Sequence, residues 1–254
     1  MISGYPLWVV LLIGAGVFCA SFVDAIGGGG GIISVPVYLL AGLPVHNALG
    51  TNKMSACLGT VASTLRYLKS GFVDWGLALP AVAFALVGSH LGTRLQLMAD
   101  ERYLKYMLLI VLPIVAAVMF KQKKFPEEKG EINRKLQCAI VWGAALVIGV
   151  YDGFYGPGTG TFLLLIFCNF AKMDLRCASG TVKVVNLASN VGAVTTALTA
   201  GTVLVPIGLI AAAFSALGHY LGAGMTIKGG AKVVRPVILT VLALLAVKVI
   251  SELL

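Results

Sequence analysis

The sequence predicts an all-α polytopic membrane protein made of two inverted-topology five-segment repeats, with glycine-broken helices in segments 1/2 and 6/7. Of its 254 residues, 59 % are hydrophobic and only 11 % are charged, and the mean hydropathy is +0.96. Soluble domains carry about 25 % charged residues, so this composition excludes a water-soluble globule. The apolar residues fall into ten segments, and the two halves of the chain repeat the same motifs in the same order.

The first half, residues 1–120, contains five apolar segments and is predicted to be the first repeat. A membrane span needs about 20 apolar residues, or fewer where it is broken. No basic region precedes the first segment, so we expect it to be the first helix of the mature protein and not a signal peptide. The five glycines at 27–31 disfavour helix and predict a break after segment 1. The expected segments are 5–25, 28–43, 46–69, 74–98 and 103–120.

The second half, residues 137–254, is predicted to be the second repeat. A stretch rich in glycine and containing a proline, at 153–161, predicts a break between segments 6 and 7. Between the halves lies the polar stretch 121–136, which is predicted to be a basic cytoplasmic linker. The expected segments are 137–154, 157–171, 175–199, 203–225 and 233–251.

Matching motifs support the internal repeat. Asp24 and Asp152 each precede a glycine-rich break and lie 128 positions apart, and the sequence GTNK at 50–53 matches GTVK at 180–183. A Gly-xxx-Gly spacing, which lets two helix backbones approach closely, also recurs. It occurs at Gly88 and Gly92 and again at Gly218 and Gly222.

The distribution of basic residues predicts the orientation in the membrane. If segments 1 and 2 return to the side on which they begin, and segments 6 and 7 do the same, the second half is inverted. Thirteen of the 19 lysines and arginines then lie on one side and four on the other. The positive-inside rule places the thirteen in the cytoplasm and both termini in the periplasm. Topology thus accounts for the net charge of +9, and we expect no nucleic-acid partner.

Four ionisable residues lie inside the apolar segments: Asp24, Lys53, Asp152 and Lys183. Charges at this depth are costly and are functional candidates by default. One alternative is that the lysines extend outward to the interface. Another is that the aspartates cap the broken helices. The functional interpretation is that Asp24 and Asp152 carry a coupling proton or Na⁺.

The two glycine breaks predict an anion site. Non-helical backbone at membrane depth is tolerated where it lines a cavity, and a helix that restarts there directs free N–H groups and a positive dipole end toward it. We expect helices to restart near 31–34 and 158–161 and to face each other, with Lys53 and Lys183 adding positive charge. A small oxyanion fits such a site.

Other chemistries lack support in the sequence. No Lys-Ser or Lys-Thr follows the glycines as a phosphate-binding loop requires, and no nucleophile elbow is present, so we expect no enzyme. The three histidines and five cysteines show no metal-ligand or paired spacing, so no metal or cofactor is expected. The histidines are His46, His90 and His219.

Several of these motifs resemble the TauE/SafE sulfite exporter family, also called toluene-sulfonate-uptake permeases. The resemblance lies in FVDAIGGGGG at 22–31, VP at 35–36, GTNK at 50–53, RY at 66–67 and VDW at 73–75, and it extends over the whole chain. It implies a secondary carrier of the bacterial inner membrane for small sulfur-containing anions such as sulfite, sulfoacetate or other organosulfonates, commonly working as an exporter.

The resemblance also adds residues to the candidate site. The family motifs fall on Asp24 and the glycines at 27–31, on Thr51, Asn52 and Lys53, and on 156–161 and Lys183. The second half departs from the pattern at Val182, where the first half has Asn52; one polar and one apolar wall suit a substrate with distinct ends, such as sulfoacetate. Asn186 and Asn190 follow Lys183 on a similar helix face. The predicted substrate-binding residues are Gly28, Gly29, Gly30, Gly31, Ser34, Thr51, Asn52, Lys53, Gly158, Thr159, Gly160, Thr161, Lys183, Asn186 and Asn190.

The leading hypothesis is alternating access of the two inverted halves around an anion site at the membrane midplane. One alternative is a passive anion channel whose glycine backbone forms a selectivity filter. Another is a membrane subunit that docks a partner through the loop at 121–137, although the glutamates of that loop favour a solvated linker. The expected partners are the sulfur oxyanion and the lipid bilayer, and a homodimer formed through a Gly-xxx-Gly face stays open.

Overall fold

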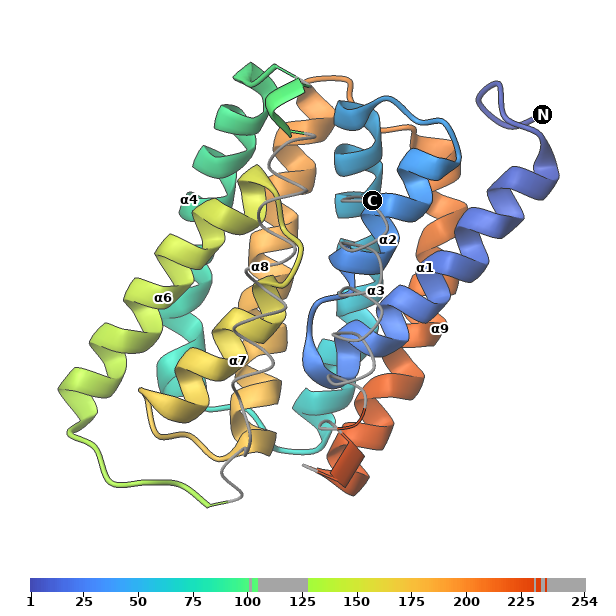
Figure 1. The fold of residues 1–254 in the computed structure, drawn as a ribbon. Helices are drawn as coiled ribbons and strands as arrows, with labels where there is room; N and C mark the ends of the chain where they lie inside the picture. Colours follow the sequence, from blue (N-terminus) through green and yellow to red (C-terminus); the bar gives the residue numbers. More distant parts are fainter. Residues whose placement is uncertain (101, 105–127, 231, 234–235, 237–254) are drawn as a thin grey trace, which may run out of the picture.

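The computed structural model describes residues 1–100, 102–104, 128–230, 232–233 and 236, and its regular elements are helices (Figure 1). Segments 5 and 10 of the sequence, at 103–120 and 233–251, and most of the linker lie largely outside the described residues. The helices are α1 (Leu7–Gly27), α2 (Gly31–Leu40), α3 (Val45–Lys69), α4 (Trp75–Met98), α6 (Arg134–Phe154), α7 (Thr159–Asn169), α8 (Leu175–Thr199) and α9 (Val205–Gly229). The all-α polytopic membrane fold is confirmed.

Four of the described helices, α1, α4, α6 and α9, are long and apolar enough to cross a membrane. Large hydrophobic side chains cover their outer faces, as lipid contact requires, including Trp8 at 68 % exposed and Leu79 at 68 % exposed. Helices α3 and α8 are as long but more polar, and most of the polar residues of α8 are buried. A helix that buries polar side chains belongs at the centre of a membrane bundle, where protein and not lipid surrounds it.

Both expected breaks are present, and each separates a long helix from a short one. Helix α1 ends at Gly27, Gly28 and Gly29 adopt φ of +78° and +86°, and α2 then runs for 10 residues. In the second half α6 ends at Phe154, and α7 restarts after the left-handed Gly158 and runs for 11 residues. Ten residues of helix measure about 15 Å, half the hydrocarbon thickness. In Figure 1 both short helices turn back toward the side from which their partners came.

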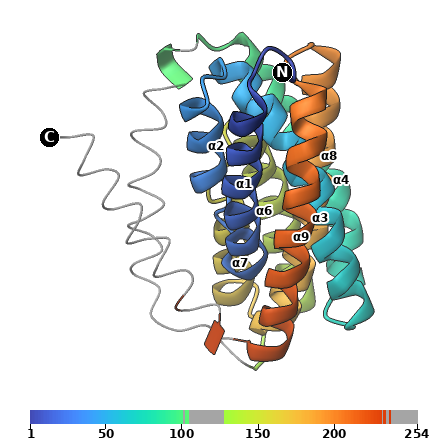
Figure 2. The same ribbon diagram turned by 90° about the vertical axis from the view of Figure 1, so that its right-hand side faces the viewer.

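Two four-helix bundles make up the described fold, and each combines helices from both halves of the sequence. Helices α1, α2, α3 and α9 form the first bundle, and α4, α6, α7 and α8 form the second. Figure 1 shows them side by side, with α3 packed against α8 between them, and Figure 2 shows the first bundle in front of the second. In Figure 1, α1 runs downward from the N-terminus whereas α6 runs upward. The first bundle therefore contains the first three helices of the first half of the sequence together with α9 of the second half. The second bundle contains the first three helices of the second half together with α4 of the first half.

The Gly-xxx-Gly pairs create the close contacts within these bundles. A Cβ on Gly88 or Gly92 of α4 would overlap the backbone of α6 at Leu146 and Val150. A Cβ on Gly218 or Gly222 of α9 would overlap the backbone of α1 at Phe18 and Phe22. The four glycines are thus occupied by helices of the same chain, because close backbone packing is what a small-xxx-small spacing provides. They do not offer a free face for the homodimer considered above.

Candidate functional site

The two helix breaks meet directly at the centre of the molecule. Thr161 Oγ1 at the start of α7 donates a hydrogen bond of 2.9 Å to the carbonyl oxygen of Gly27 at the end of α1. Gly28 lies against the backbone of Gly160 and Thr161 so closely that it has no room for a side chain. Non-helical backbone at membrane depth is thereby buried against protein, which satisfies its polar groups.

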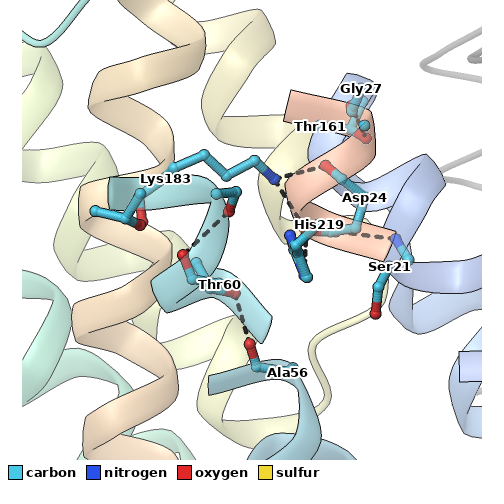
Figure 3. A network of polar contacts seen from close by, with 12 residues as sticks. Ser21, Asp24, Gly27, Ala56, Thr60, Thr161, Lys183 and His219 are labelled. Carbon is cyan, nitrogen blue, oxygen red and sulfur yellow. Dashed lines mark hydrogen bonds and ion pairs between the residues drawn. The ribbon is translucent and has the colours of Figure 1, made fainter. Parts of the chain in front are cut away.

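The four ionisable residues predicted at membrane depth form two ion pairs, and each pair joins the two bundles. Lys183 Nζ on α8 lies 2.9 Å from Asp24 Oδ2 on α1 and also donates to the Asp24 carbonyl oxygen (Figure 3). Lys53 Nζ on α3 lies 2.7 Å from Asp152 Oδ1 on α6. Each lysine therefore pairs with the aspartate of the opposite repeat, and neither ammonium is an unpaired positive charge. Since removing one partner of a buried pair leaves an uncompensated charge, the pairs are strongly coupled.

Further hydrogen bonds hold each carboxylate in place. Asp24 Oδ1 accepts from the backbone N–H of Gly30 at 3.0 Å, across the break that follows α1. Asp152 Oδ2 accepts from the Ser189 hydroxyl at 2.5 Å. Asp24 is thus both a cap for the restarting chain and an ion-pair partner, and its role in coupling stays a prediction.

A polar cavity lies beside the ion pairs, between the two bundles. It encloses about 530 Å³ of space between atoms, including the part open to solvent. Both aspartates line it, together with Ser21 and His219. The predicted substrate-binding residues that line it are Gly30, Gly31, Ser34, Asn52, Lys53, Thr159, Gly160, Asn186 and Asn190.

Six of the predicted substrate-binding residues do not line this cavity: Gly28, Gly29, Thr51, Gly158, Thr161 and Lys183. Thr51 Oγ1 accepts from the backbone N–H of Leu204, which precedes α9, at 3.0 Å. In the other half Thr181 Oγ1 accepts from the N–H of Asp74, which precedes α4, at 3.2 Å. The threonine of each GT-x-K motif therefore anchors the start of a helix of the other repeat. Lys183 lines a second, smaller cavity with Gly28 and Val182.

The restarting helices offer fewer free N–H groups than the glycine runs suggest. At α2 the N–H of Gly30 is taken by Asp24, and those of Ile33 and Ser34 donate to the Gly30 carbonyl oxygen. At α7 the N–H of Thr159 donates to the carbonyl oxygen of Gly156. The asparagine amides of the cavity are further donors for an anion, whereas the hydroxyls of Ser34, Ser55, Thr60 and Thr159 already donate to backbone carbonyl oxygens.

Comparisons with known proteins agree with the membrane fold. The sequence profile of the family described as "Sulfite exporter TauE/SafE" matches residues 12–249. A "Probable membrane transporter protein ORF9" of Sinorhizobium sp. is 34 % identical over 235 residues, covering 92 % of this chain and 90 % of the relative. The chain belongs to the TauE/SafE sulfite exporter family.

Other relatives support the TauE/SafE assignment. A "Probable membrane transporter protein" of Haemophilus influenzae is 34 % identical over 239 residues, covering 92 % of each chain. The "Probable membrane transporter protein YfcA" of Escherichia coli K12 is 30 % identical over 234 residues, covering 92 % of this chain and 86 % of the relative. No solved structure matches the chain significantly. The prediction of a multi-pass membrane transporter of this family is confirmed.

One residue that lines the candidate site was not among the site residues predicted from the sequence. His219 on α9 is 2 % exposed, lines the cavity and places Nε2 3.8 Å from Asp24 Oδ2. The internal repeat contains the missed signal, because the residue 130 positions earlier is Ser89. A titratable group that breaks the repeat inside an apolar helix is a functional candidate. Among the described residues no three His, Cys, Asp or Glu side chains come together as metal ligands.

Proposed function

We propose that this chain is a secondary active transporter that moves a small sulfur-containing oxyanion, such as sulfite, sulfoacetate or a related organosulfonate, across the bacterial inner membrane, in the direction of export. The observation that carries the proposal is the polar cavity between the two bundles, in which donors from both repeats converge beside two buried ion pairs. Family membership supports the substrate class, since the family is described as sulfite exporters. Transport is coupled to a proton or Na⁺ gradient.

The anion in this proposal is held mainly by neutral donors. Asn52 reaches the cavity from α3, and Asn186 and Asn190 reach it from α8. Oxygen atoms of a sulfonate or sulfite accept hydrogen bonds from such amides. Lys53 also lines the cavity and adds positive charge, which its partner Asp152 largely balances.

Alternating access requires two bodies that move against each other around the site. In the proposed mechanism these bodies are the two bundles and not the two halves of the sequence. The cavity, both ion pairs and the contact between Gly27 and Thr161 all lie at the junction of the bundles. Rocking about the contact between α3 and α8 would expose the cavity to one face of the membrane and then to the other, with both termini in the periplasm.

Substitutions in the pair of Lys53 and Asp152 test this assignment with opposite signs. Lys53→Met leaves the Asp152 carboxylate unpaired beside the anion, and we expect the KM for sulfoacetate or sulfite to rise about tenfold or more. Asp152→Asn leaves the ammonium unpaired, and we expect the KM to fall. Initial rates of radiolabelled anion uptake into proteoliposomes give both values.

The matched control is Asp174→Asn, which changes a carboxylate that caps α8 away from the cavity. Asparagine caps a helix as well as aspartate does, so the KM is expected to stay at the wild-type value. Size-exclusion chromatography in detergent confirms that each variant is folded. Shifts of the KM in the same direction for Lys53→Met and Asp152→Asn would show that the charge of this pair does not act on the anion.

A further inference from the structure

The charges around the cavity sum to zero without an anion. Asp24 and Lys183 form one neutral pair, and Asp152 and Lys53 form the other. An oxyanion that entered this cavity would therefore add an uncompensated negative charge in a water-poor environment, which is costly. A counter-charge has to arrive with the anion.

His219 is the group in the described chain that is placed to supply it. It lines the cavity, its side chain is 2 % exposed, and its Nδ1 is buried without a hydrogen-bond partner in the described structure. Figure 3 shows the imidazole beside the pair of Asp24 and Lys183. Gly59 on α3 leaves the space for the ring, because a Cβ there would lie 2.7 Å from His219 Cδ2.

Charged groups reach His219 from several elements. Asp24 is the nearest, at 3.8 Å from Nε2, but its carboxylate is already paired with Lys183 at 2.9 Å. Lys53 on α3 and Asp152 on α6 line the same cavity. Arg66 on α3 donates a hydrogen bond to the carbonyl oxygen of Tyr220, the residue that follows His219. The charged groups around this histidine are Asp24 on α1, Lys53 and Arg66 on α3, Asp152 on α6 and Lys183 on α8.

The two other histidines do not share this setting. His46 Nδ1 is hydrogen-bonded to Gln96, and His90 Nδ1 is hydrogen-bonded to Thr196 at 2.7 Å. Neither residue lines the cavity. At the matching position of the first repeat, Ser89 has no titratable group and donates to the Leu86 carbonyl oxygen. The described cavity is therefore asymmetric, with a titratable imidazole beside one ion pair only.

We propose that His219 takes up one proton with each anion, so that the protein is an oxyanion–proton symporter. Protonation gives both ring nitrogens a hydrogen: Nε2–H faces the Asp24 carboxylate, and Nδ1–H becomes a donor that the described chain leaves unsatisfied. The proton enters from the same side as the anion and leaves with it on the other side. For a monovalent sulfonate the transported charge is zero, and export occurs when the outward gradient of the anion exceeds the inward gradient of the proton.

The test is proton uptake on binding, and the inference rests on the proposed function. Methanesulfonate and, separately, sulfoacetate are added to detergent-solubilised protein in weakly buffered solution above the pH at which free His219 is protonated, with a pH dye as the readout. We expect about one proton to be taken up per bound anion for both probes. For His219→Gln we expect an affinity at least about tenfold weaker and no proton uptake. His90→Gln, which changes a histidine outside the cavity, should match the wild type.

Each outcome separates the inference from the proposed function. Binding to the wild type without proton uptake, or uptake that persists in His219→Gln, overturns the symport inference and leaves the transporter proposal standing. Failure of the folded wild type to bind methanesulfonate, sulfoacetate and sulfite overturns the proposed function and the inference with it. In proteoliposomes, methanesulfonate transport that a potassium diffusion potential accelerates would also overturn the inference, because an electroneutral cycle does not respond to voltage.

Discussion

At Gly28 two independent requirements for glycine coincide. The residue has a φ of +78°, and a Cβ there would overlap the backbone of Thr161 and Gly160 on the opposite break. Gly71, after α3, has a similar φ of +74° but no atom within 4 Å of its Cβ position. The comparison of these two glycines separates the cost of the left-handed backbone from the cost of the contact between the breaks.

We therefore predict that Gly28→Ala destabilises the protein more than Gly71→Ala. A side chain at a positive φ costs about 1–3 kcal/mol at either position, and the overlap at Gly28 adds about 1–3 kcal/mol. The melting temperature in detergent, measured by differential scanning fluorimetry, reports the difference. Equal losses in the two variants would show that the breaks do not pack against each other as described.

Residue identities were predicted from the sequence better than residue partners. Asp24, Lys53, Asp152 and Lys183 are identifiable because charges at membrane depth are costly. Their pairing across the bundles was not predictable, because it depends on how the two repeats pack. The same limit applies to Thr51, whose hydroxyl anchors the start of α9 and does not line the cavity.

Helix boundaries were predicted closely where the sequence contains caps and less well at the breaks. The expected segments 74–98 and 175–199 agree with α4 and α8, and Asp74 and Asp174 cap these helices. The expected segment 28–43 is longer than α2, which ends at Leu40. Backbone geometry at a glycine run depends on the packing of the opposite break, and the local sequence alone does not contain that information.

A surface ion pair fixes the start of α4 to the start of α6. Arg134 donates two hydrogen bonds of 2.9 Å to the Asp74 carboxylate, one to each oxygen. These bonds, with the nearby positive charge of the guanidinium, hold the pKa of Asp74 below its usual value. A carboxyl whose pKa is lowered by folding stabilises the protein above its unfolded pKa, and this contribution is lost as the pH falls through the folded pKa.

We predict that Asp74→Asn lowers the melting temperature at pH 7 but has little effect in acid. Asparagine keeps the cap on α4 and removes the ion pair, which is partly exposed and contributes about 0.5–1 kcal/mol. The difference from the wild type should begin to shrink as the pH falls below about 4, the ordinary pKa of an unfolded aspartate, and should continue to shrink as the pH falls through the lower pKa of the folded carboxyl. Thermal unfolding of the detergent-solubilised protein between about pH 3 and about pH 7 checks this, because that range includes the ordinary pKa of an aspartate. A difference that stays constant across this range would contradict the assignment.

At the scale of the whole molecule, the repeats of the sequence and the bundles of the structure are different units. The sequence divides after the fifth segment, but α4 packs with α6 and α8, and α9 packs with α1 and α3. This exchange was not predictable from the motif spacing, which reports the order of elements along the chain and not their neighbours. It places the cavity and both buried ion pairs at one junction, where a movement of the bundles would act on all of them together.

The central claim is that this cavity belongs to a carrier of small sulfur oxyanions, and exchange across a membrane tests it most directly. Purified protein in liposomes would be loaded with unlabelled sulfoacetate or sulfite, and uptake of the labelled anion from outside measured. A carrier returns faster when loaded than when empty if the empty return limits its cycle, so we expect the internal anion to accelerate uptake. Two results would contradict this claim. One is uptake no faster than in protein-free liposomes. The other is uptake that is accompanied by an ion conductance and that the internal anion does not accelerate, as in a channel.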